Sequence, residues 1–574
     1  MSTATGAAAH PGESAVRIEQ IGECLVVWVA SGRRPSVEVA RELPAETGRI
    51  AVVMADADPS IMADLAQQLS EWVPERWQSV RLVTAHAGAG NGSPPAQELS
   101  EMLGVEVIAP DGDLLFVPGG SLYIMNTDGR PERASWWRFR PGRPPEASGK
   151  RFPAPEWERD LAGFQANLAG VVVDQVPAGL WVRQPGEVPP TDLAFAVPIH
   201  PKTLALIVSR PGDQPIRAGD LRRLIEAIPE TLRDRLAVTP YGDNPVANGR
   251  LGPVVSSAAN ETLRVRTGLP LKFPQGGTQI VAVGRNGAPT WSPFAWEVAW
   301  RPHAGGRIRR WVQPAGHLLP VGAGQFLLNK QWLVEVVEAG LWIREVERLD
   351  GASLVRELPL ESRHCTVVVG GGSGTGRVSP PWRSIVKLLG RLPDAARKRF
   401  RLAVMQEHLV GNARRACGRI LAGGVVWMLA ADGSLMPHGT AAPNTRPAPD
   451  TRPAPDTRPA SAPRPEESRP EELRPEESRV AAPERDAGSD HPTRYPAPVE
   501  PAPSQEVGDP PPGQLVPPTV PTTAPPFVPV PDRVVSEERE DRVARAMVVR
   551  DSSADHESPP PGSEHDERGT GSPG

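Results

Sequence analysis

The fold is decided by residues 365–408, which read CTVVVGGGSGTGRVSPPWRSIVKLLGRLPDAARKRFRLAVMQEH. An apolar run is followed by a glycine-rich turn, an amphipathic segment that ends at Pro393, and a second apolar run after Arg401. A short strand, a helix and another short strand form a βαβ unit with parallel strands and a right-handed crossover. The amphipathic segment should pack on the sheet through a helical stripe of apolar residues: Trp382, Ile385, Val386, Leu388, Leu389 and Leu392.

The same pattern occurs twice earlier in the chain, in residues 50–86 and 204–242. The apolar runs IAVVM, LALIV and TVVV are typical of central strands that are covered on both faces. A proline follows the first part of each helix, at Pro74, Pro229 and Pro393. An Arg-Leu pair opens the second apolar run, beginning at Arg81, Arg235 and Arg401. Self-similarity of this kind indicates a repeated structural module.

Flanking segments extend the repeat on both sides. AGLWVR (178–183) and AGLWIR (339–344) precede the βαβ patterns of the second and third copies, and CLVVWV (24–29) precedes that of the first. The Asp-Gly turns in APDGDL (109–114) and AADGSL (430–435) indicate hairpins. Aromatic blocks follow the first two copies, at residues 136–142 and 294–302. We therefore predict three tandem, diverged, small α/β repeat domains with mixed sheets, each long enough to bury its own core.

The predicted boundaries divide the chain into five parts. They are a disordered N-terminus (1–15), the first copy (16–160), the second copy (161–322), a shorter third copy (323–438) and a disordered, acidic, proline-rich tail (439–574). The tail holds 30 of the 69 prolines, and from residue 440 onward 25 Asp and Glu stand against 15 Arg. Such a segment cannot bury enough apolar surface to offset its chain entropy.

Two segments of the tail have alternative interpretations. Residues 517–531 offer PxxP spacings around Phe527, which are read by aromatic-lined grooves but also occur in plain spacers. Residues 536–549 favour a short helix with acids in its first turn. A helix of this length is marginal alone, so it either frays in solvent or folds on a partner.

Composition excludes several classes of protein. The three cysteines form neither a disulfide framework nor a Cys/His metal cluster, which predicts a reducing compartment and no metal site. The N-terminus shows no secretory signal, and no apolar run approaches the ~20 residues that cross a bilayer. We expect a cytoplasmic protein without membrane contact, with signal-independent export left open. The basic run RIRRW (307–311) is short and reads as a solvated strand or turn, so no nucleic-acid partner is expected.

The candidate ligand site is the glycine-rich turn after the first strand of the third copy. It comprises Gly370, Gly371, Gly372, Ser373, Gly374, Thr375 and Gly376. A glycine loop between a strand and a helix can present backbone N–H groups to a phosphate. However, Arg377 and Val378 stand where a Walker A loop needs Lys and Ser or Thr, and a flexible linker explains the glycines equally well.

Other candidates have simpler structural explanations, so no catalytic residue and no cofactor are predicted. Asp56 and Asp58 follow a strand and could hold Mg²⁺, but Asp58 before Pro59 is also a good helix cap. His364 and Cys365 are adjacent and, in a strand, point to opposite faces. The tryptophans of the aromatic blocks could line a ligand groove or pack in the core: Trp136, Trp137, Trp296 and Trp300.

Residues 136–158, WWRFRPGRPPEASGKRFPAPEWE, together with the general Arg/Ala/Pro/Gly bias, resemble repeat segments of large actinobacterial multidomain proteins of polymorphic-toxin type. The resemblance implies a non-catalytic repeat segment that works beside a separate effector. The sequence thus predicts a non-enzymatic interaction or scaffold protein that binds another protein through its repeats or its tail. The alternatives are a nucleotide- or phosphate-binding enzyme that uses the loop Gly370–Gly376, or an accessory part of a toxin system.

Overall fold

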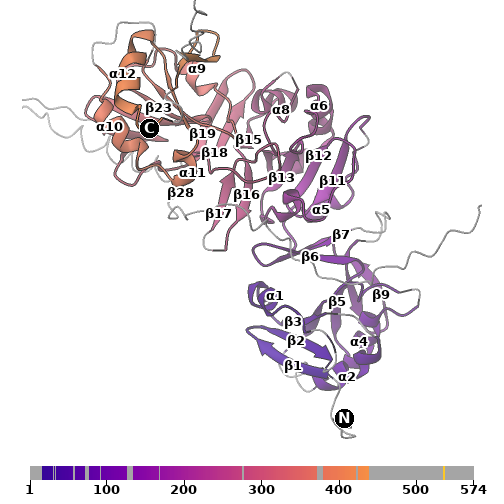
Figure 1. Ribbon diagram of the computed structural model, residues 1–574. Coiled ribbons are helices and arrows are strands. Elements are labelled where there is room, and N and C mark those ends of the chain that lie inside the picture. Colours follow the sequence, from indigo (N-terminus) through magenta and orange to yellow (C-terminus); the bar gives the residue numbers. More distant parts are fainter. Residues whose placement is uncertain are drawn as a thin grey trace, which may run out of the picture. The chain divides into compact units, whose positions relative to one another are not determined.

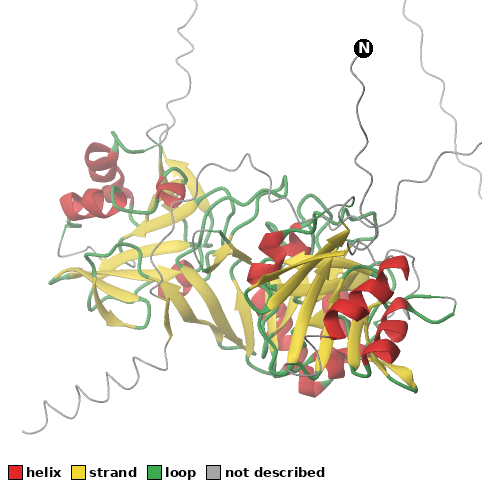
Figure 2. Cartoon of the chain, turned by 90° about the horizontal axis from the view of Figure 1, so that it is seen from below, coloured by secondary structure: helices red, strands yellow, loops and turns green. Residues whose placement is uncertain are grey.

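Three large sheets of seven, eight and eight strands follow one another along the chain (Figure 1). The computed structural model describes residues 16–29, 32, 34–55, 59–70, 77–90, 92–125, 134–166, 168–247, 249–274, 277–371, 379–421, 425–438 and 534–536. Helices lie against the strands of each sheet (Figure 2). Among these residues no helix is both long enough and apolar enough to cross a membrane.

The first copy has the strand order β1-β2-β3-β4-β5-β8-β9. The bounds are β1 Val16–Ile21, β2 Cys24–Val29, α1 Val37–Glu42, β3 Arg49–Met54, α2 Pro59–Ser70, β4 Ser79–Val83, α4 Pro95–Leu103, β5 Glu106–Pro110, β8 Trp136–Arg140 and β9 Arg143–Ala147. A separate three-stranded sheet has the order β10-β7-β6 and is formed by β6 Asp113–Val117, β7 Ser121–Met125 and β10 Arg151–Phe152.

The second copy has the order β11-β12-β13-β14-β15-β18-β19-β28. After α5 (Glu158–Ala162), the bounds are β11 Val172–Val176, β12 Gly179–Arg183, η1 Leu193–Ala196, β13 Leu204–Val208, α6 Ala218–Ala227, α7 Glu230–Arg233, β14 Leu236–Pro240, α8 Leu251–Ala259, β15 Leu263–Arg266, β18 Ala295–Arg301 and β19 Gly305–Val312. A two-stranded sheet is inserted before β18, formed by β16 Leu269–Lys272 and β17 Thr278–Val281.

The third copy has the order β20-β21-β22-β23-β24-β25-β26-β27. The bounds are β20 Leu319–Gly322, β21 Gln325–Asn329, β22 Trp332–Val337, β23 Gly340–Glu345, α9 Ala352–Arg356, β24 Cys365–Val369, α10 Trp382–Leu389, α11 Asp394–Arg397, β25 Phe400–Val404, α12 Glu407–Cys417, β26 Val426–Leu429 and β27 Leu435–His438.

One topology recurs in all three copies. An antiparallel hairpin (β1-β2, β11-β12 or β22-β23) leads into parallel strands, and an antiparallel strand (β8, β18 or β27) closes the run. Each copy has four parallel strands, which lie side by side in the order of the sequence. They are β2 to β5 in the first copy, β12 to β15 in the second and β23 to β26 in the third. The three tandem mixed α/β sheets predicted from the repeat are thus confirmed.

The helices of each copy lie on opposite faces of its sheet. In the first copy α1 packs on one face with Val26 and Val53, whereas α2 and α4 pack on the other with Val27 and Val52. In the second copy η1 packs on one face of the sheet, and α6 and α8 pack on the other. In the third copy α9 packs on one face, and α10 and α12 pack on the other. Because successive parallel strands are added in one direction, connections over opposite faces have opposite hands. The three βαβ units predicted from residues 50–86, 204–242 and 365–408 all connect over the face that carries α2, α6 and α10.

The amphipathic segment of the third copy forms the predicted helix α10. Ile385, Leu388 and Leu389 are fully buried in the core, and Trp382 and Val386 pack against it. The helix ends earlier than predicted, at Leu389, so Leu392 lies beyond it. Pro393 stands directly before α11, as Pro229 stands before α7. The first marker, Pro74, lies outside the described residues.

Strand pairing corrects one of the sequence equivalences and adds another. Arg81 pairs with Ala51 and Arg401 pairs with Thr366, but the corresponding partner of Ala205 is Ala237. The Arg-Leu pair at Arg235 is therefore displaced by two residues in the second copy. Likewise, Cys24 occupies the place of Gly179, so that Val26, rather than Trp28, corresponds to the tryptophan of AGLW. Periodicity alone does not resolve a shift of two residues, because it keeps a side chain on the same face.

The Asp-Gly turns differ between copies. In the third copy the turn joins β26 to β27 as an antiparallel hairpin, as predicted. In the first copy the turn at Asp111 and Gly112 instead leads from β5 into β6, which pairs with β7 in the small sheet. The prediction of a hairpin there is wrong, since the chain changes sheets at this turn.

The core of the third copy includes residues from the second. Trp291, Phe294 and Trp311 belong to the same hydrophobic cluster as β24, α10 and α12. The expectation that each copy buries a core of its own thus does not describe the third. A hydrogen bond from the indole Nε1 of Trp291 to the carbonyl oxygen of Glu361, at 3.2 Å, crosses the same boundary.

A short segment of the tail belongs to the sheet of the second copy. β28 (Val534–Ser536) pairs antiparallel with the last residues of β19. The disorder predicted for the tail does not extend to these three residues, and Ser536, where a helix was expected to begin, is part of the strand. The other tail residues, including the PxxP segment, lie outside the described part of the chain.

Candidate functional site

The recurring AGLW[VI]R segment has a structural role. Gly179 and Gly340 begin β12 and β23 with φ of +149° and +144°. A Cβ on Gly340 would lie 2.4 Å from the carbonyl oxygen of Thr366, and one on Gly179 would lie 2.3 Å from that of Ala205. Because only glycine allows this approach with this backbone, the motif residue serves strand pairing.

The tryptophan and arginine of the same segment fix loops at the carboxyl edge of the sheet. The indole Nε1 of Trp181 donates to the carbonyl oxygen of Ser209 at 2.8 Å, and that of Trp342 donates to Gly370 at 2.7 Å. Arg344 donates from Nε to Glu335 at 2.9 Å and from Nη1 to the carbonyl oxygens of the loop after β23. Arg183 contacts Asp174 and its own loop equivalently. These groups are all used within the fold.

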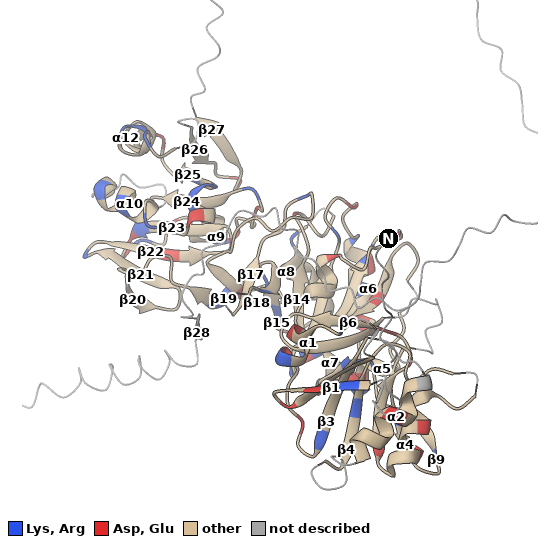
Figure 3. Ribbon diagram, turned by 60° about the horizontal axis from the view of Figure 1, so that its bottom comes forward, with Lys and Arg blue, Asp and Glu red and all other residues tan. Residues whose placement is uncertain are grey.

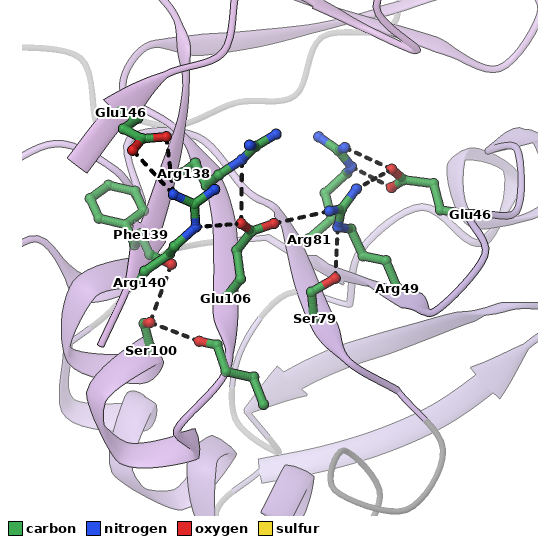
Figure 4. A network of polar contacts seen from close by, with 11 residues as sticks. Glu46, Arg49, Ser79, Arg81, Ser100, Glu106, Arg138, Phe139, Arg140 and Glu146 are labelled. Carbon is green, nitrogen blue, oxygen red and sulfur yellow. Dashed lines mark hydrogen bonds and ion pairs between the residues drawn. The ribbon is translucent and has the colours of Figure 1, made fainter. Parts of the chain in front are cut away.

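A second recurring feature is an ion-pair network at the amino edge of the parallel strands (Figure 4). In the first copy Arg81 donates to both carboxylate oxygens of Glu46, at 2.7 and 2.9 Å. Arg49 bridges Glu46 at 2.6 Å and Glu106 at 3.0 Å, and donates to Ser79 at 2.9 Å. In the third copy Arg401 contacts Glu361 at 2.6 Å in the matching position.

The electrostatics of these pairs indicate structure rather than proton transfer. Burial raises the pKa of Glu46, but hydrogen bonds and charge from Arg81 and Arg49 outweigh it, so the pKa lies below its usual value. The pKa of Glu361 is lowered in the same balance by Arg401 and His364. A carboxylate with a lowered pKa stays ionised near neutral pH, so it has no proton to donate as a general acid and is a weak general base.

The carboxyl edge of the third copy is different, because a cavity of about 330 Å³ opens there. Gly370 and Gly371, at the end of β24, line it. The other lining residues come from the start of β22, the end of β23, the approach to α10 and the start of α12: Trp332, Glu345, Ser379, Pro380, Gln406, His408, Leu409 and Asn412. Of the predicted loop, Gly372, Ser373, Gly374, Thr375 and Gly376 lie outside the described residues.

The position of this cavity follows from the topology. The chain leaves β23 toward α9 on one face and leaves β24 toward α10 on the other. Loops that depart to opposite faces from adjacent parallel strands leave a crevice between them, which is where ligands bind in open α/β sheets. Gly370 has φ of +110° and its carbonyl oxygen accepts from Trp342, so the glycine fixes how the chain enters this loop.

The same place is closed in the second copy. Arg210, after β13, donates to the carbonyl oxygen of Glu187 at 3.0 Å and contacts Asp192 at 3.2 Å. Gln184, after β12, donates to the carbonyl oxygen of Gln214 at 3.3 Å. These bonds join the two loops that would otherwise separate. In the first copy, residues 56–58 after β3 lie outside the described part, and with them the Asp56 and Asp58 candidates; α2 nevertheless begins at Pro59, as the capping interpretation predicts.

A smaller cavity of about 270 Å³ in the first copy was not predicted. His86, Gly88, Gly90, Asp111 and Trp137 are among its lining residues. His86 contacts Asp113 at 2.9 Å, but none of the lining residues that the structure describes is a Ser, Thr, Cys or Lys nucleophile. A second glycine-rich turn in front of a helix, GAGNG at residues 88–92, is the sequence signal that could have revealed it.

The remaining candidates take structural places. His364 precedes β24 and contacts Glu361 at 3.0 Å, whereas Cys365 is fully buried. Trp136, Trp296 and Trp300 are buried, and Trp300 also lines a cavity of about 480 Å³. Trp137 is partly exposed and donates to Asp111 at 2.7 Å. Within the described residues, no group of His, Cys, Asp and Glu could hold a metal ion.

The cysteines give a direct prediction. All three are buried, and burial raises the pKa of the thiols to about 11 for Cys24, about 12 for Cys365 and about 11 for Cys417. Since the thiolate is the reactive form, we expect no reaction with a thiol reagent in the native protein and three equivalents in urea. Titration with a chromogenic disulfide checks this; rapid labelling of the native chain would contradict it.

Comparison with known proteins gives no match: no family model, no curated protein and no solved structure is similar to this chain.

Proposed function

We propose that the chain is a non-enzymatic interaction protein, in which three α/β copies present surfaces to a protein partner and the tail serves as a spacer or a second binding arm. One observation carries the proposal. The polar groups that recur between copies pair with each other within the fold, as Arg81 does with Glu46 and Arg401 with Glu361. The carboxyl edges, where α/β enzymes place their chemistry, carry unlike residues.

The charge distribution supports a protein partner over a nucleic acid. Basic and acidic residues are interspersed over the described elements (Figure 3). The basic run lies in β19, where Arg307 and Arg310 stand on an exposed strand near the acidic Glu297 of β18. Recognition of nucleic acid requires a concentrated basic face. The resemblance of residues 136–158 to toxin-type repeats makes an effector protein the partner class to examine first.

A second candidate function, a nucleotide- or phosphate-dependent enzyme, is favoured by the position of Gly370 and Gly371 beside the third-copy cavity. Thermal shift with ATP, GTP and NAD, with and without Mg²⁺, separates the two proposals. A ligand at 100 times its Kd stabilises the folded state by about 2.7 kcal/mol, so binding is easily seen. We expect no shift with any of them, and a saturable shift with one would replace the interaction protein by the enzyme.

The partner arm of the test uses the full chain and a form that ends at residue 438, both tagged and purified from the source cells. We expect one protein to co-purify with the full chain in fixed stoichiometry and to rebind to the purified chain. Loss of that protein from the shortened form would place binding on the tail, and retention would place it on the copies. Absence of any stoichiometric partner from the full chain would contradict the proposal.

A further inference from the structure

The charge of the third-copy cavity decides which small molecules it can hold. Glu345 is the only Asp, Glu, Lys or Arg among its described lining residues. The Glu345 side chain is 19% exposed, and its carboxylate contacts Arg348 at 3.5 Å, which is longer than a good charge-assisted hydrogen bond. The Glu345 carboxylate therefore keeps acceptor capacity beyond this ion pair. Arg348 lies beside Gly371 but is not among the lining residues, so the charged group that lines the described part of the cavity is a carboxylate, which disfavours a phosphate.

Further polar side chains line the same cavity. Ser379 offers a hydroxyl and His408 an imidazole. Asn412 accepts from Arg415 through its Oδ1 at 2.6 Å, which leaves its amide Nδ2 to donate. The indole N–H of Trp332 is buried in the wall and has no hydrogen-bond partner within the described part of the chain. Donors and acceptors mixed around one carboxylate suit a ligand with several hydroxyl groups.

The volume of the third-copy cavity and its apolar lining residues are those expected for a small ligand. A volume of about 330 Å³ is at the lower end of the ~300–1,000 Å³ typical of ligand pockets. Trp332, Pro380 and Leu409 supply apolar wall, against which the carbon face of a sugar ring can pack.

We propose that the third-copy cavity binds a small polyhydroxylated ammonium compound of hexosamine size, with the ammonium group at the Glu345 carboxylate and the hydroxyl groups at Ser379 and Asn412. No reaction is involved. The proposal is independent of the protein-partner function, because it concerns a small-molecule site in one cavity and not a surface for a protein.

Three sugars that share one ring test the charge preference: glucosamine, glucose and glucose 6-phosphate. Binding to the full chain is measured by titration calorimetry at a pH where the amine is protonated. We expect glucosamine to bind about tenfold more tightly than glucose, which corresponds to ~1.4 kcal/mol, and glucose 6-phosphate to bind least. Tighter binding of the phosphate than of glucose would overturn the proposal in favour of the anion site, and binding of none of the three would overturn it altogether.

Two variants place the preference on Glu345. Glu345→Gln keeps the shape of the side chain but removes its charge, so glucosamine and glucose should bind equally. Glu347→Gln is the matched control, because Glu347 is exposed and does not line the cavity. Asn412→Ala should weaken both sugars by a similar factor and keep their ratio. A preference for glucosamine that persists in Glu345→Gln would show that the ammonium group lies elsewhere.

Discussion

Replacement of Arg151 by Met is expected to destabilise the protein by about 3–5 kcal/mol, the usual loss when one partner of a buried ion pair is removed. The Arg151 side chain is 1% exposed and contacts Glu158 at 2.7 Å. It also donates to the carbonyl oxygens of Pro177 and Val176, both at 2.7 Å. Arg151→Met leaves the Glu158 carboxylate buried without its charge partner. Urea unfolding followed by tryptophan fluorescence measures the loss.

Two further variants make this result specific. Arg159→Ala changes an exposed arginine in α5, and its effect should stay within about 0.5 kcal/mol. The double variant Arg151→Met/Glu158→Leu should recover much of the stability, because apolar residues of similar volume often replace a buried ion pair without loss. A double variant as unstable as Arg151→Met alone would mean that the hydrogen bonds to Pro177 and Val176, rather than the ion pair, hold this region together.

Gly340→Ala is expected to destabilise the third copy by about 2–5 kcal/mol, since backbone strain and overpacking each cost ~1–3 kcal/mol. The added Cβ would lie 2.4 Å from the backbone oxygen of Thr366 at a φ of +144°. Gly411→Ala is the matched control. Gly411 is exposed in α12 and nothing lies within 4 Å of its Cβ position, so alanine should stabilise the helix by about 0.5–1 kcal/mol. Equal effects of the two changes in the same unfolding assay would refute the role assigned to Gly340.

The sequence predicted those parts of the fold that depend on local patterning. Apolar runs located β3, β13 and β24, the stripe from Trp382 to Leu392 located α10, and Pro393 marked the break before α11. The register of strand pairing could not be predicted as well from the sequence. A displacement of two residues, as for Arg235, leaves the same face buried and the same pattern in the sequence. The sheet of β16 and β17 was not predicted, and of the three-stranded sheet only a strand after the Asp-Gly turn at Asp111 was expected.

Of the residues that line the third-copy cavity, the sequence predicted only the two glycines at the end of β24. Gly370 and Gly371 were identified because a glycine loop after a strand is a local signal. Their neighbours in the cavity, including Glu345 and Asn412, come from elements that are distant in sequence. No single-sequence pattern connects them, since their proximity depends on which face each crossover takes. That choice is set by packing of α9 and α10 against opposite sides of the sheet.

The hydrophobic cluster that the second and third copies share has a consequence for how this protein arose. A gene segment that began at the sequence boundary near residue 323 would encode a third module without Trp291, Phe294 and Trp311, and so without part of its hydrophobic core. We therefore expect the second and third copies to unfold together rather than separately. Because aromatic side chains of the second copy complete the core of the third, we expect the third copy not to fold when it is expressed without the second. Their surfaces can still diverge, since surface residues do not contribute to this shared core.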